Sequence, residues 1–222
     1  MTDALLHVVR HAEPDHGGPG ESAASGLTAR GLAQAQALGT RLGRAGVDAV
    51  LHGPLPRAER TALRLAAAAG GVPVAVCDHL DDRTPLPGDL DDVPAVHRPF
   101  VRAALAGGGD EVDLDATALR RAVEAFSPGA LAATLASCLG APVAGPPDRP
   151  LHVVLVTHAF VVGWFVRDAL DAPDWRWMGL NASHASLTTI LMRDGRPATL
   201  LGFDDLSHLP DDLRSGLAVP RP

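Results

Sequence analysis

Two short apolar runs, one near each end of the chain, both stop at a histidine. The first, at residues 5–9, leads into Arg10 and His11, and the second, at residues 151–156, leads to His158. A short apolar run that ends at polar side chains predicts a buried parallel strand. In open α/β sheets ligands bind beyond the carboxyl ends of such strands, so the two histidines are expected in one crevice.

Between these runs, strand and helix patterns alternate. Thr28 is a predicted N-cap, followed by apolar residues at helical spacing up to about residues 43–46. We then predict a strand at 47–51, a helix at 57–69 that ends at Gly70-Gly71, and a strand at 72–76. This order predicts an α/β fold with three α/β/α layers, in which a mostly parallel central sheet carries helices on both faces.

The middle of the chain breaks the alternation. Residues 78–115 are crowded with Asp, Pro and Gly, and we interpret them as an excursion over the sheet. The expected organisation is a single domain over residues 1–222, with a cap-like insertion at about 78–126. Further along we predict a helix at 116–126, a helix that starts at Ser127-Pro128 and ends at Gly140, a helix at 160–170, strands at 187–192 and 199–203, and a loosely held tail at 210–222.

Composition narrows the classes of function. The chain has 222 residues, of which 46% are hydrophobic, enough for one sizeable core. Its net charge is −7 and all 19 basic residues are arginine, which argues against nonspecific nucleic-acid binding. No basic leader and no run of about 18 apolar residues is present, so we expect neither a secretion signal nor a membrane span. With only two cysteines, far apart in the sequence, a reducing cytoplasmic location is expected.

A third segment, at residues 53–62, adds a candidate anion-binding residue. Arg57 comes at the predicted start of a helix, directly after a strand. A guanidinium offers a fixed fork of donors for phosphate or carboxylate, and a helix N-terminus favours an anion nearby. From the residues alone, Arg57 fits a surface role equally well. Next to an arginine that binds an anion, His11 would be a nucleophile that is neutral near pH 7.

Several motifs resemble those of the histidine phosphatase superfamily, which has the phosphoglycerate mutase-like fold. Arg10-His11-Ala12-Glu13 resembles its "RHG-E" signature, and Thr157-His158 resembles its second histidine after a late strand. Similar segments occur at residues 27–31 (LTARG), 54–62 (PLPRAERTA), 180–183 (LNAS) and 205–209 (DLSHL). Together they span nearly the whole chain in the family's order.

The resemblance implies a role for each matching residue. Arg10 and Arg57 correspond to the phosphate-binding arginines, and His11 to the nucleophile that forms a phosphohistidine. His158 corresponds to the second histidine, which contacts the phosphoryl group. The implied activity is a cofactor-independent phosphatase that hydrolyses a phosphate monoester, with no metal. The implied partner is a small phosphorylated substrate; a homodimer remains an open alternative.

The proton donor of the family is usually a glutamate, and here the position falls on Asp82. Asp82 is one methylene shorter, so Asp81 stays open as the alternative donor. Other departures are Ala12 in place of Gly and His52-Gly53 in place of Ser-Ser.

Two other activities also remain open. A phosphoglycerate-type mutase is disfavoured because an acidic segment follows Arg83. A non-hydrolytic member that binds a phosphorylated or other anionic small molecule is the second alternative. His184 and His208 could approach the site, but for each of them we expect a structural or surface role.

Overall fold

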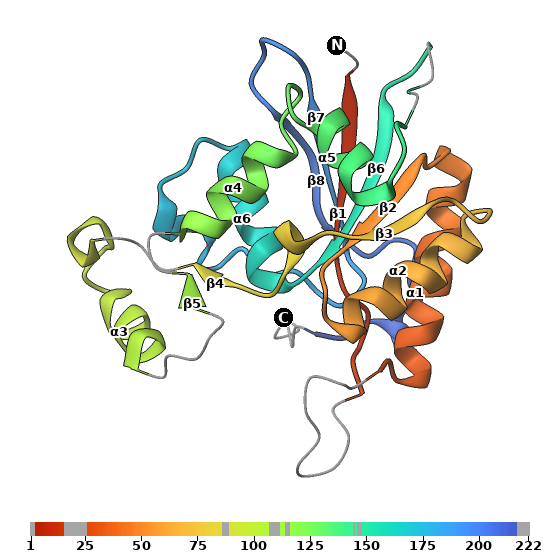
Figure 1. The fold of residues 1–222 in the computed structure, drawn as a ribbon. Helices are drawn as coiled ribbons and strands as arrows, with labels where there is room; N and C mark the ends of the chain where they lie inside the picture. Colours follow the sequence, from red (N-terminus) through yellow and green to blue (C-terminus); the bar gives the residue numbers. More distant parts are fainter. Residues whose placement is uncertain are drawn as a thin grey trace.

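The computed structural model describes residues 3–15, 26–85, 89–106, 112–113, 116–143, 145 and 148–216, and Figure 1 shows its ribbon. Its centre is a six-stranded sheet in the order β3-β2-β6-β1-β7-β8. The strands are β1 (Ala4–Arg10), β2 (Ala49–His52), β3 (Val74–Val76), β6 (Leu151–Thr157), β7 (Leu187–Met192) and β8 (Thr199–Asp205).

Strand direction agrees with a mostly parallel sheet. β1, β2, β3 and β6 run parallel, while β7 pairs antiparallel with β1 and with β8. β1 and β6 pair over their whole length, from Ala4 opposite Leu151 to Arg10 opposite Thr157. Because the two strands end at the same level, the residues that follow them, His11 and His158, emerge side by side.

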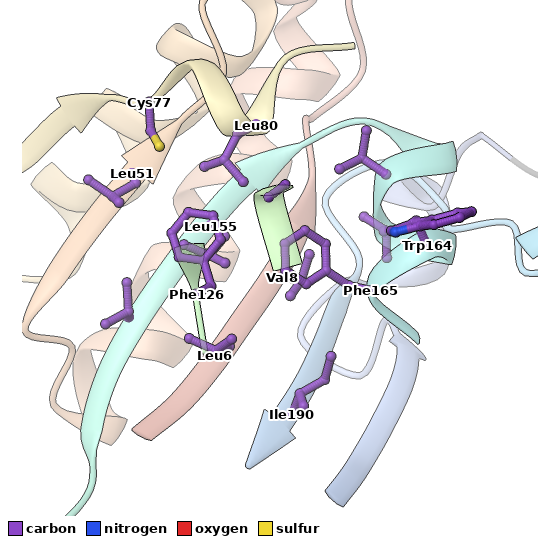
Figure 2. Close-up of a cluster of buried hydrophobic side chains, with 14 of the residues drawn as sticks. Leu6, Val8, Leu51, Cys77, Leu80, Phe126, Leu155, Trp164, Phe165 and Ile190 are labelled. Carbon is purple, nitrogen blue, oxygen red and sulfur yellow. The ribbon is translucent and has the colours of Figure 1, made fainter. Parts of the chain in front are cut away.

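Helices cover both faces of this sheet, as the sequence predicts. α1 (Ala29–Ala45) and α2 (Pro56–Ala68) lie on one face. α4 (Thr117–Ala125), α5 (Leu131–Leu139) and α6 (Ala159–Ala169) lie on the other. Successive residues of a strand point to opposite faces of the sheet and so pack in two separate hydrophobic cores. Val8 packs with Phe126 and Phe165 (Figure 2), whereas Val9 packs with residues of α1 and α2.

Local signals explain where most helices begin and end. The Thr28 hydroxyl accepts the N–H of Gly31 at the start of α1, and Gly46 ends this helix with φ of 78°. The predicted start of a helix at Ser127-Pro128 is wrong. The Ser127 carbonyl accepts the N–H groups of Ala130 and Leu131, which closes a separate turn, and α5 begins only at Leu131.

The excursion after β3 contains short elements: η1 (Asp78–Leu80), β4 (Thr84–Pro85), η2 (Leu90–Asp92), α3 (Arg98–Ala106) and β5 (Val112–Asp113). β4 and β5 form a small separate sheet, and α3 lies away from the central sheet (Figure 1). Val93 and Val101 anchor this region on Trp175 and Met178. α4, by contrast, packs in the main core through Leu119 and Ala122.

The prediction of a loosely held tail is wrong for residues 213–216. The side-chain amide of Gln34 donates to the Leu213 carbonyl at 2.6 Å and to the Ser215 hydroxyl at 3.0 Å. The Ser215 carbonyl accepts the N–H of His184. The rest of the predicted tail, residues 217–222, lies outside the described residues, as do residues 16–25. None of the described helices is long and apolar enough to cross a membrane.

Candidate active site

The carboxyl ends of β1 and β6 place two buried imidazoles next to each other. The ring centroids of His11 and His158 are 5.1 Å apart, and both side chains are buried. The backbone N–H of His11 donates to the Thr157 carbonyl at 2.8 Å, which extends the strand pairing as far as the site. The two histidines that follow the apolar runs therefore lie next to each other in the fold, as predicted.

The tautomer of His11 follows from its backbone contact. His11 Nδ1 lies 2.8 Å from the Ala12 carbonyl, which can only accept, so Nδ1 carries the proton and Nε2 the lone pair. Burial lowers the pKa of His11 well below its usual value, and the charge on His158, when protonated, and those of Arg10 and Arg57 act in the same direction. His11 is thus a neutral imidazole with its lone pair on Nε2.

His158 is a buried ring whose nitrogens make no hydrogen bond among the described residues. Its Nδ1 lies 3.3 Å from Asp82 Oδ2, an ion-pair distance that does not meet hydrogen-bond geometry. Burial, followed by the charge of Arg57, lowers the pKa of His158 to about 3. An unsatisfied polar ring at such depth is costly, and a ligand oxygen at this point would supply its partner.

Arg57 and Asp82 form the central ion pair of the site. Arg57 Nη2 donates to Asp82 Oδ2 at 2.6 Å. Arg57 is held at the first turn of α2, directly after Pro56, and its carbonyl accepts the hydroxyl of Thr61. The same hydroxyl accepts the N–H of Ala12 at 3.0 Å. One threonine therefore fixes the start of α2 against the segment that carries His11.

The carboxyl group of Asp82 is largely buried. Burial raises its pKa, although Arg57, Arg10 and Arg83 favour the charged form. The alternative donor, Asp81, is turned to its own loop: it accepts the N–H of Asp82 and pairs with Arg83 at 3.0 Å. The geometry therefore places Asp82 rather than Asp81 beside the arginine and the second histidine.

Arg10 and Gly53 complete the surroundings of the site. Arg10 Nη1 donates to the Ala182 carbonyl at 2.7 Å, while its Nε is buried without a partner among the described residues. Gly53 replaces a serine of the family pattern; a Cβ there would lie 2.3 Å from the Leu80 carbonyl. Glycine thus permits the segment that leads to Asp82 to pack against β2. All five predicted site residues converge: Arg10, His11, Arg57, Asp82 and His158.

The structure adds a histidine for which the sequence had indicated a structural or surface role. The ring of His184 lies 5.7 Å from that of His11, centroid to centroid. The next residue, Ala185, donates its N–H to the carbonyls of Arg10 and His11. The signal that could have identified His184 is its place just before a predicted strand, but the pattern does not show that β7 pairs with β1. Among the described residues no three His, Cys, Asp or Glu side chains are placed to share a metal ion.

Comparisons with known proteins agree with this arrangement. The model of the histidine phosphatase superfamily (branch 1) matches residues 6–205, so the chain belongs to this family. No curated protein matches significantly.

Solved structures share its phosphoglycerate mutase-like fold at low identity. A mycobacterial hydrolase has a TM-score of 0.66 and 22% identity, over 96% of this chain and 95% of its own. A mycobacterial glucosyl-3-phosphoglycerate phosphatase has a TM-score of 0.63 and 22% identity, over 91% and 99%. A putative α-ribazole-5'-phosphate phosphatase from Escherichia coli has a TM-score of 0.61 and 17% identity, over 91% and 96%.

Proposed function

We propose that the protein is a cofactor-independent phosphatase that hydrolyses a small phosphate monoester through a phosphohistidine on His11. The observation that carries the proposal is the neutral His11, whose Nε2 bears a lone pair in a site that also holds Arg10, Arg57 and the unsatisfied ring of His158. Phosphoryl transfer requires such a nucleophile together with fixed donors for the phosphoryl oxygens.

The first half of the proposed reaction uses each of these groups. His11 Nε2 attacks phosphorus and forms the N–P bond, while the bond from phosphorus to the ester oxygen breaks. Arg10, Arg57 and His158 hold the phosphoryl oxygens as charge moves. Asp82, in its protonated form, gives its proton to the leaving oxygen and releases the alcohol.

In the second half, water takes the place of the alcohol. Asp82, now ionised, accepts a proton from this water as its oxygen attacks phosphorus. The N–P bond breaks, inorganic phosphate leaves, and both His11 and Asp82 return to their starting protonation states. The phosphatases among the structures of the same fold support this class of reaction, and their different names leave the identity of the ester to experiment.

The proposal is tested with a panel of phosphate monoesters and the release of inorganic phosphate as the readout. We expect turnover of at least one ester and an acid-labile, base-stable phosphoenzyme after rapid quenching. Isomerisation of 3-phosphoglycerate without net phosphate release would favour the mutase. A panel that stays inert at high enzyme concentration would favour the non-hydrolytic alternative.

Asp82→Asn is expected to separate leaving-group protonation from the rest of the reaction. For alkyl phosphates, whose leaving oxygen needs a proton, we expect kcat to fall about 10²- to 10⁴-fold. For p-nitrophenyl phosphate, whose leaving group is stable as an anion, phosphoenzyme formation should fall much less. Single-turnover kinetics with both esters measure this ratio. Asp81→Asn is the matched control, and a loss of kcat in that variant together with normal turnover in Asp82→Asn would identify Asp81 as the donor.

The maximum of kcat/KM as a function of pH should lie below pH 7. Because the pKa of His11 is lowered, the attacking neutral ring persists when the pH falls below 6.5. Because the pKa of Asp82 is raised, its proton-donating form extends to higher pH than that of an ordinary Asp. Initial rates with an alkyl phosphate from pH 4 to 9 measure the profile. A decline centred near pH 6.5 on acidification would contradict the neutral, desolvated nucleophile.

A further inference from the structure

A short turn far along the chain contacts Arg10 twice. Residues 182–186 form this turn, directly before β7, and a backbone hydrogen bond of 3.2 Å closes it. Arg10 Nη1 donates to the Ala182 carbonyl at 2.7 Å. The Ala185 N–H contacts the carbonyls of Arg10 and His11 at 3.1 and 3.3 Å. The turn therefore supports both the main chain and the guanidinium of Arg10.

The carboxylate of Asp204, near the end of β8, binds the same turn. Its Oδ1 accepts the N–H of Ser183 at 2.6 Å, and its Oδ2 accepts the Ser183 hydroxyl at 3.1 Å. This N–H and the Ala182 carbonyl belong to one peptide group. Because a trans peptide group is planar, its C=O and N–H point in opposite directions, and fixing one fixes the other. A single rigid peptide group thus lies between the guanidinium of Arg10 and the carboxylate of Asp204.

The backbone at Asp204 departs from a regular strand. Leu187 of β7 lies opposite Asp205, and Thr189 lies opposite Gly202, so β8 has one residue more than β7 between these pairs. Asp204 lies in this bulge with φ of 51°, in the left-handed region that non-glycine residues rarely adopt. β-Bulges redirect side chains, and strained backbone of this kind is found mainly at functional sites. The irregularity therefore directs the Asp204 carboxylate to the 182–186 turn.

We propose that Asp204 is a positioning residue for Arg10: through the peptide group between Ala182 and Ser183, it holds the guanidinium in the orientation that binds the phosphoryl oxygens. The inference rests on the proposed phosphatase function. Asp204 acts through Arg10 and not by contact with the phosphoryl group. A displacement of about 1 Å in a group that positions the substrate can cost about 10²-fold in rate. Loss of the Asp204 carboxylate should therefore weaken catalysis only while Arg10 is present.

Two substitutions separate the hydrogen bonds of Asp204 from its charge. Asp204→Asn keeps an oxygen acceptor for the Ser183 N–H and an amide partner for the Ser183 hydroxyl, and asparagine tolerates the left-handed backbone. Asp204→Gly keeps that backbone conformation but removes both acceptors. With the ester that the wild type hydrolyses fastest, we expect kcat/KM to fall about 10- to 100-fold in the Gly variant and to stay close to the wild-type value in the Asn variant. Equal losses in both variants would overturn the proposal.

Thr199→Gly is the matched control, because it places a glycine at the other end of β8 and also removes a side-chain hydrogen bond, the one from Arg193 at 3.0 Å. We expect wild-type kinetics in this variant. A loss equal to that of Asp204→Gly would assign the effect to a weakened strand and contradict the positioning role. Thermal unfolding is measured for each variant. If Asp204→Gly does not fold, Ser183→Ala, which removes only the hydroxyl contact to Asp204, should give a smaller loss of kcat/KM.

A double-mutant cycle with Arg10→Ala distinguishes positioning from general structural support. If Asp204 acts through Arg10, the loss of kcat/KM caused by Asp204→Gly should disappear when residue 10 is alanine. If Asp204→Gly lowers kcat/KM by the same factor with and without the guanidinium, the proposal fails.

Binding of inorganic phosphate keeps this test independent of turnover. Isothermal titration calorimetry should show a Kd raised about three- to tenfold by Asp204→Gly, little changed by Asp204→Asn, and not raised further when Asp204→Gly is added to Arg10→Ala. This pattern supports the role of Asp204 even if no ester is hydrolysed. If the wild type hydrolyses an ester and Asp204→Gly changes neither kcat/KM nor Kd, the phosphatase function stands and the role of Asp204 fails. If the wild type neither hydrolyses an ester nor binds phosphate, both proposals fail.

Discussion

Replacing His11 by Asn is expected to abolish turnover, with kcat reduced about 10⁴-fold or more. The Asn amide can retain the donor contact of Nδ1 to the Ala12 carbonyl, but it has no nucleophilic nitrogen at the position of Nε2. The loss should therefore come from the chemical step and not from unfolding. Released phosphate, trapped phosphoenzyme and thermal unfolding are measured on the same preparation.

His97→Asn serves as the control for this substitution, because His97 is exposed and contacts Trp175 away from the central pair of histidines. We expect wild-type turnover in this variant. A His11→Asn protein that still releases phosphate at a substantial fraction of the wild-type rate would exclude His11 as the nucleophile.

Arg57→Ala should have the second largest effect, a loss of about 10²- to 10³-fold in kcat/KM. The substitution removes the donors that we propose for the phosphoryl oxygens, and it leaves the partly buried carboxylate of Asp82 without its 2.6 Å partner. Without that cation, the pKa of Asp82 should rise further. The pH profile of the residual activity should therefore extend to higher pH on the limb that Asp82 controls.

Arg60→Ala is the matched control, since Arg60 lies on the same helix one turn later and is exposed. Steady-state kinetics of both variants across pH decide the outcome. If Arg57→Ala and Arg60→Ala reduce kcat/KM by similar small factors, Arg57 does not bind the phosphoryl group.

Local patterns were sufficient to predict most of the fold. The apolar runs of β1 and β6, the N-cap at Thr28 and the order of strands and helices each depend on residues close together in the sequence. The resemblance of several motifs to one family then supplied Arg57 and Asp82. The two histidines meet because β1 and β6 pair in parallel with Arg10 opposite Thr157. Arg57 joins them because β2, which precedes it, pairs in parallel with β6, and Asp82 bonds to Arg57.

What the sequence did not predict depends on contacts between distant segments. His184 approaches His11 because β7 pairs antiparallel with β1. The hydrophobic periodicity of a strand does not indicate which other strand it pairs with. Residues 213–216 are held because Gln34, far away in α1, bonds Leu213 and Ser215. The reason for glycine instead of serine at position 53 is also visible only in the folded chain, where the missing side chain makes room for the Leu80 carbonyl.

The ion pair between Arg57 and Asp82 also bears on how the proposed product would leave. A guanidinium that has just lost a phosphate ion in a buried site would be an uncompensated cation, which is strongly unfavourable. Here the carboxyl group of Asp82 lies next to it, and once this group loses the proton that it took from water, its carboxylate can take the vacated coordination. Departure of phosphate then becomes an exchange of one anion for another. The chain therefore carries its own counter-ion for Arg57 in the empty site.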